Sequence, residues 1–261
     1  MKRIAVIGCS FSDYYQDKNL PEPVKTWSEW MADDNPDVHV DNYACSGHSL
    51  AYVEFVLKYI RKYRNDYHAV MFNIPPLPRS WMPTAKTPGV SLSEHETWFT
   101  PVDVANNYTA MTCNISRINL VSETALASGY DPMPRQELKG LAKIIGKESD
   151  GMKIPNALIL DSIDKYYAKE IPNLIYWSHE WMLRSKPELE LTELAPFFHN
   201  HKGNLSDTNK HVIEFLIDKY GEQYTAEFLM TDSAHLSSLG NQLMYTEFLL
   251  PNQNVMSVLK H

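Results

Sequence analysis

Short apolar runs and one periodic segment organise the first part of the chain. Residues 3–7 form a β-branched apolar run ending at Gly8, and residues 69–73 form another, a pattern typical of strands buried on both faces. Residues 38–42 are a further short extended candidate, and Ser49 then begins a helical pattern. The apolar face of that helix consists of Leu50, Val53, Leu57 and Ile60. This succession predicts a βαβ crossover with parallel strands, whose carboxyl ends form one ligand-binding edge.

The later sequence predicts more helices and one more strand. The expected elements are helices at 104–128, 156–169, 210–220 and 238–250 and a strand at 174–177. Gly129 and Gly221 stand where the first and third of these helices would end.

Residues 75–101 contain six prolines and two tryptophans, so we expect a long loop without regular structure there. Such a loop, at about residues 75–103, is either a functional lid or binding segment or a proline-rich surface excursion.

Composition and charge narrow the class of protein. Apolar residues make up 44% and charged residues 21% of the 261 positions, which is typical of a folded globular chain. The net charge of −8 disfavours nucleic acid or an anionic membrane as a partner, because both require clustered cations. Without a repeat or a sharp change of composition, we expect one α/β domain over residues 1–261, with a central parallel sheet between two helical layers.

Cysteine use and hydropathy bear on the compartment. Cys9, Cys45 and Cys113 cannot all pair and form no CxxC spacing, which favours a reducing environment. The apolar stretch before Gly8 is too short for a secretory signal, and no run approaches the roughly 18–20 apolar residues of a membrane span. We therefore expect a cytoplasmic protein without a signal peptide or transmembrane segment.

The first chemical motif directly follows the first predicted strand and reads Gly8-Cys9-Ser10-Phe11-Ser12. The glycine permits a tight turn, and a serine there presents its hydroxyl at the ligand-binding edge, near backbone amides that can stabilise an oxyanion. Taken alone, the pentapeptide also fits an ordinary strand-to-helix turn.

The second motif lies directly before the last predicted helix, where Asp232 and His235 are three positions apart. In a turn, the carboxylate can orient the imidazole, which can then take a proton from a serine hydroxyl. Taken alone, the pair also fits a capping or turn residue and a surface histidine.

Together the two motifs resemble those of the SGNH (GDSL-type) hydrolase superfamily. GCSFS stands for the family's first motif and DSAH, residues 232–235, for its last; Gly47 stands for the glycine of its second motif. The chain looks most like the branch with a GCSFT-like start found in phage and bacterial genomes. The resemblance implies a flavodoxin-like three-layer α/β/α fold, and a virion-associated location if a phage encodes the chain.

The resemblance also implies a role for each matched residue. Ser10 would be the nucleophile, His235 the base and Asp232 its orienting acid. The backbone amides of Ser10 and Gly47 would form part of the oxyanion hole. Asn73 would complete the hole, although the family's GxND motif is replaced here by FNIP at residues 72–75.

Three further sets of residues each allow two interpretations. Cys9 stands where the family has aspartate; we expect its side chain to pack into the protein, with a thiol nucleophile as the alternative. Arg79 could hold an anionic or carbonyl group of a substrate, or be a solvated loop residue. His199 and His201 lack a third nearby ligand, so we expect solvated loop residues and no metal site.

These expectations give a serine hydrolase that cleaves an ester, such as an O-acetyl group on a carbohydrate, and uses no metal or organic cofactor. Its partner would be a small-molecule or glycan ester, and the oligomeric state is left open. Two alternatives remain: a carbohydrate O-acyltransferase with the same triad, and a non-catalytic binding or virion-associated structural protein.

Overall fold

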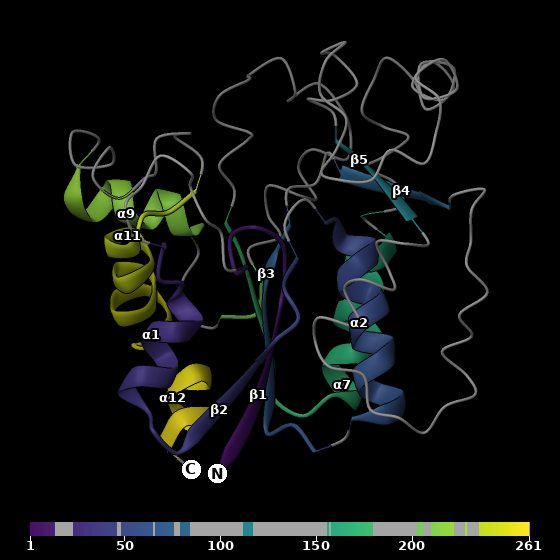
Figure 1. Cartoon of the computed structure of the whole chain (residues 1–261), viewed down its shortest axis with the longest axis horizontal. Helices are drawn as coiled ribbons and strands as arrows, with labels where there is room; N and C mark the ends of the chain where they lie inside the picture. Colours follow the sequence, from purple (N-terminus) through teal and green to yellow (C-terminus); the bar gives the residue numbers. More distant parts are fainter. Residues whose placement is uncertain are drawn as a thin grey trace.

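A parallel sheet forms the centre of the molecule (Figure 1). The computed structural model describes residues 1–13, 23–45, 48–64, 66–75, 79–83, 112–116, 156, 158–179, 203–205, 210–221, 228 and 235–260. Within these ranges, four strands pair in the order β2-β1-β3-β6, and every pairing is parallel. The strands are β1 (Lys2–Ile7), β2 (Val38–Asn42), β3 (Ala69–Ile74) and β6 (Leu174–Ser178). All four confirm the strands predicted from the sequence.

The apolar runs form strands here because both faces of the sheet are covered. Every residue of β3 is buried, as are the last four of β1. Neighbouring side chains of one strand therefore enter different cores: Ala5 packs with the residues of α2, whereas Val6 packs with those on the opposite face.

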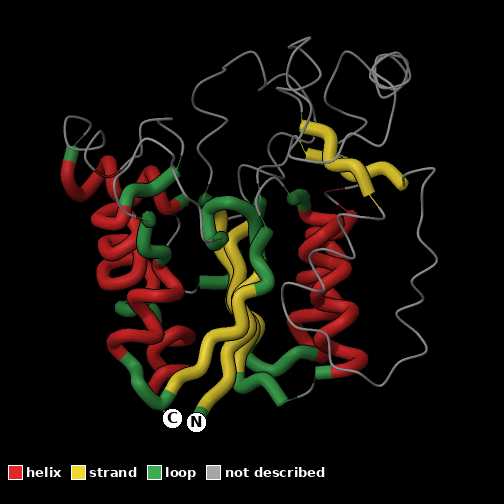
Figure 2. Tube along the Cα trace, viewed as in Figure 1, coloured by secondary structure: helices red, strands yellow, loops and turns green. Residues whose placement is uncertain are grey.

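Helices cover the two faces, which gives three layers (Figure 2). One layer holds α2 (Leu50–Tyr63) and α7 (Ala168–Glu170), the latter preceded by the π-helical turn η1 (Ile163–Tyr167). The opposite layer holds α1 (Trp27–Asp34), α9 (Val212–Tyr220), α11 (Ser238–Leu243), the π-helical segment η3 (Met244–Leu249) and α12 (Gln253–Lys260). The predicted α/β class with a central parallel sheet is confirmed.

Most predicted helices are present with the expected ends. Ser49 is the N-cap of α2, and Gly221, with a φ of +85°, follows the last turn of α9. The helix predicted at 238–250 is present as α11 followed by η3. The sequence reading missed α12, although Val255, Val258 and Leu259 have helical spacing and are buried.

Two short strands show that the predictions for the middle of the chain were partly wrong. Residues 75–103 were expected to lack regular structure, yet Arg79–Pro83 forms strand β4. It pairs antiparallel with β5 (Thr112–Ser116), which falls inside the helix predicted at 104–128. Short apolar runs do not separate strand from helix by periodicity, and the β-branched Thr112 and Ile115 suit an extended chain. The remainder of both segments lies outside the described residues.

A short segment around Gly203 and Asn204 forms hydrogen bonds with the edge of β6 that faces away from β3. The Asn204 side chain accepts a hydrogen bond from Tyr176 N at 2.9 Å and donates one to Leu174 O at 2.7 Å, and Asn204 N donates to Tyr176 O at 2.9 Å. Gly203 approaches so closely that an added Cβ would lie 2.0 Å from Tyr176 O. This segment therefore satisfies backbone groups that an open strand edge would leave exposed.

Among the helices of the described ranges, none combines the length and the apolar character that crossing a membrane requires.

Candidate functional site

The candidate site lies at the carboxyl ends of β1 and β3, where the strand order reverses. From β1 the chain continues to β2 on one side, and from β2 it crosses to β3 on the other side of β1. The loops leaving β1 and β3 consequently diverge, and in open parallel sheets such a switch point is the usual place for a ligand. Ser10 follows β1, and Asn73 lies near the end of β3.

A tight turn after β1 fixes the position of Ser10. Gly8 has a φ of +152°, which an L-residue rarely adopts, and an added Cβ would lie 2.3 Å from Asn73 Oδ1. The turn continues with hydrogen bonds from Ser12 N and Asp13 N to Cys9 O, at 2.9 and 3.1 Å. Among the described residues, the Ser10 N–H has no hydrogen-bond acceptor, so it remains able to bind one.

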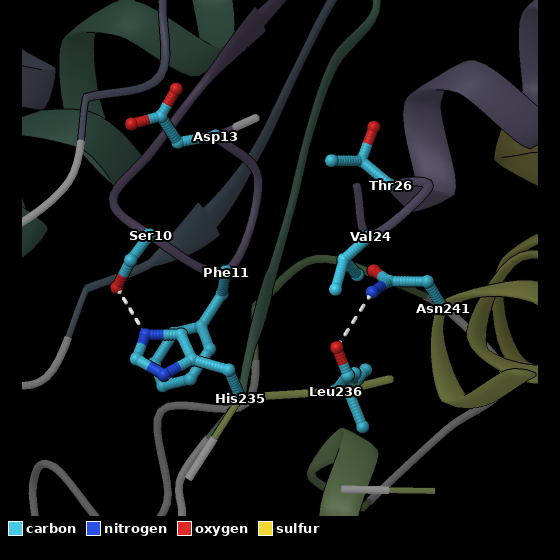
Figure 3. A pocket seen from close by; sticks show the side chains of 8 residues that line it. All are labelled: Ser10, Phe11, Asp13, Val24, Thr26, His235, Leu236 and Asn241. Atoms are coloured by element: carbon cyan, nitrogen blue, oxygen red, sulfur yellow. Dashed lines mark hydrogen bonds between the residues drawn. The ribbon is translucent and has the colours of Figure 1, made fainter. Parts of the chain in front are cut away.

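The structure brings together Ser10 and His235, which are far apart in the sequence. Ser10 Oγ lies 2.6 Å from His235 Nε2, a hydrogen-bond distance (Figure 3). This contact joins the first and the last motif, and the separation is within the range for proton transfer. Ser10 is 8% exposed, so its hydroxyl is largely shielded from water.

Hydrogen bonds from α11 and α1 hold the segment that follows His235. Asn241 Nδ2 donates to Leu236 O and to Ser237 O, both at 3.1 Å, and its Oδ1 accepts from Trp27 N at 3.2 Å. Ser237 caps α11 by accepting from Gly240 N at 3.2 Å. His235 is thereby anchored to the helical layer that also contains α1.

A buried polar network lies beneath the turn. Ser12 Oγ donates to Asn73 Oδ1 at 2.6 Å and accepts from Trp27 Nε1 at 3.0 Å. Asn73 Nδ2 points to Cys9 Sγ at 3.7 Å, and Cys9 is fully buried. The expectation that the Cys9 side chain packs into the protein is confirmed. An oxyanion role for Asn73 would require Nδ2 to leave this weak sulfur acceptor, and the role stays a prediction.

An aromatic stack supports the imidazole of His235. The centroids of the Phe11 and His235 rings lie 5.1 Å apart, and Phe11 also stacks on His179, with centroids 3.9 Å apart and the rings nearly parallel. Burial, and then the neighbouring His235 and His211, lower the pKa of His179 to about 3. His179 is therefore a neutral ring at physiological pH.

A small pocket opens beside the pair (Figure 3). Its volume of about 10 Å³ is the space that one water molecule needs. The lining residues are Ser10, Phe11, Asp13, Val24, Thr26, His235, Leu236 and Asn241. The pocket therefore lies beside the Ser10–His235 pair.

Other predicted site residues are not placed. Gly47 and Asp232 lie outside the described residues, as do His199 and His201. The backbone of Arg79 begins β4, but its side chain is not among those described. Among the described side chains, no group of three or more His, Cys, Asp or Glu is arranged to hold a metal ion.

The sequence analysis assigned no role to three residues of the site: Ser12, His179 and Asn241. His179 could have been found, because it comes two positions after the predicted strand 174–177, at the ligand-binding edge. The roles of Ser12 and Asn241 depend on contacts with Asn73 and Trp27. The spacing of these residues in the sequence does not predict those contacts.

Comparison of the chain with protein-family models and with curated proteins gave no match.

Proposed function

We propose that this chain is a serine hydrolase that cleaves an ester, with Ser10 as the nucleophile and His235 as the base. The observation that carries the proposal is the 2.6 Å contact between Ser10 Oγ and His235 Nε2 at the carboxyl edge of the sheet. A serine hydroxyl is a weak nucleophile unless a base accepts its proton, and this geometry supplies the base.

The proposed reaction proceeds in two steps. Ser10 Oγ attacks the ester carbonyl carbon while its proton passes to His235 Nε2, and the Ser10 N–H stabilises the oxyanion that forms. Collapse of this intermediate expels the alcohol, which takes the proton from His235. Water then attacks the acyl-enzyme by the reverse sequence and releases the acid and free Ser10. Asp232 would orient the imidazole, as the SGNH resemblance implies.

An acetyl ester is the proposed substrate class, for example an O-acetyl group on a carbohydrate, as the SGNH resemblance implies.

Labelling with a fluorophosphonate tests the proposal without knowledge of the substrate, because an activated serine displaces fluoride and becomes phosphonylated. Ser10→Ala should abolish labelling, with a loss on the order of 10³-fold or more. Cys9→Ala is the matched control, because Cys9 adjoins Ser10 but is fully buried; it should keep the label.

Two outcomes contradict the proposal. Absence of labelling in the folded wild-type chain would favour a non-catalytic protein. Labelling that survives Ser10→Ala and disappears with Cys9→Ala would make the chain a thiol enzyme.

A further inference from the structure

His179 is a buried histidine that the proposed reaction does not use. It is 1% exposed, and within the described part of the chain neither ring nitrogen has a hydrogen-bond partner. An unpaired buried polar group costs about 1–3 kcal/mol, so an apolar residue at this position would lack that cost. The position therefore calls for an explanation other than packing alone.

The rings of His179 and His235 both contact the ring of Phe11. Phe11 lies against His179 with ring centroids 3.9 Å apart and an interplanar angle of 17°, and it contacts His235 at 5.1 Å with a tilt of 40°. Phe11 also directly follows Ser10 in the chain. The ring of Phe11 therefore contacts both imidazoles, more closely that of His179.

We propose that His179 is a positioning residue for His235, acting through the ring of Phe11; the inference rests on the proposed function. A flat ring stacked on Phe11 limits the tilt of Phe11, and Phe11 in turn limits the rotation of His235 away from Ser10. Positioning of this kind matters because misplacement of a reacting group by about 1 Å lowers a rate by on the order of 10²-fold.

The charge state of His179 fits this role. The titratable groups that act on it are His235 and His211, and burial is the larger cause of its low pKa. As a neutral ring, His179 neither competes with His235 for the Ser10 proton nor repels the imidazolium that forms during the reaction.

The test is a mutant cycle read out by the rate of fluorophosphonate labelling. His179→Ala and Phe11→Leu should each slow labelling by on the order of 10²-fold, and the double variant should be no slower than either, because both break the same contact. His179→Phe restores a neutral flat ring and should label at nearly the wild-type rate. His39→Ala removes an exposed histidine beside Asp41 and is the matched control for losing an imidazole.

Thermal unfolding of each variant shows that it is folded at the assay temperature. Wild-type labelling by His179→Ala, additive losses in the double variant, or failure of His179→Phe to restore the rate would each overturn the positioning role while leaving the proposed function intact. A wild-type chain that does not label at all would overturn the proposed function and this inference with it.

Discussion

Replacing Gly8 with alanine tests the turn that places Ser10. Gly8 has a φ of +152°, and the added Cβ would lie 2.3 Å from Asn73 Oδ1 and 3.2 Å from Ser12 Oγ. Because all three residues are buried together, the Asn73 amide cannot stay where it is. Gly8→Ala should therefore both unfold the protein more easily and displace Ser10 from His235.

The expected loss of stability has two parts. Backbone strain at a positive φ costs about 1–3 kcal/mol. Displacing Asn73 breaks the 2.6 Å hydrogen bond from Ser12 Oγ and leaves buried polar atoms unpaired, which costs about 1–3 kcal/mol more. The sum is about 2–6 kcal/mol, a large fraction of the stability of an ordinary domain.

Gly221→Ala separates the two parts. Gly221 also has a positive φ, +85°, but an added Cβ there would meet no atom of the described residues within 4 Å. This control should show only the backbone strain, about 1–3 kcal/mol. The assay is urea unfolding of both variants followed by circular dichroism, with fluorophosphonate labelling measured on the same samples.

The same substitution in an Asn73→Ala background tests whether the contact with Asn73 is what requires glycine. In Asn73→Ala the nearer obstructing side chain is absent, and the contact with Ser12 Oγ at 3.2 Å needs only a small shift of that hydroxyl. Adding Gly8→Ala should then cost about as much as Gly221→Ala does. If Gly8→Ala costs the same with and without the Asn73 side chain, the contact between these residues is not what requires glycine, and the argument fails.

Two further predictions concern buried polar groups. Ser12→Ala should lower the unfolding free energy by about 2–4 kcal/mol, because Trp27 Nε1 and Asn73 Oδ1 both lose their partner; urea unfolding with an unchanged midpoint would contradict it. Stability should also fall by about 3 kcal/mol between pH 7 and pH 4 through His179. Its pKa is lowered from 6.5 to about 3 on folding, so the unfolded chain binds more protons in that window. His179→Phe should abolish this contribution; the same pH slope in that variant would show that His179 is not its source.

The hydrophobic pattern correctly predicted the strands that are buried on both faces and the helix that has a single apolar face. β1 and β3 are covered on both faces and read as unbroken apolar runs, and α2 has one apolar stripe that begins after Ser49. β4 and β5 were missed because their pairing joins residues 79–83 to residues 112–116, a contact that local periodicity does not encode.

The residues of the site also differ in whether the sequence alone could identify them. Ser10 and His235 were found because each belongs to a short motif beside a predicted element, and the structure places them in contact. His179 acquires its neighbours only through the order of the strands, which brings the end of β6 next to that of β3. The hydrogen bond from Ser12 to Asn73 likewise forms only in the folded turn, and no spacing in the sequence predicts it.

The segment at Gly203 and Asn204 affects how the protein behaves in a crowded solution. A strand at the margin of a sheet can recruit a strand from another molecule, and repeated recruitment leads to fibrils. Along β6, the groups that such a strand would need at Leu174 and Tyr176 are already bound by the side chain and backbone of one asparagine. The close approach permitted by Gly203 thus makes this margin a poor template for self-assembly.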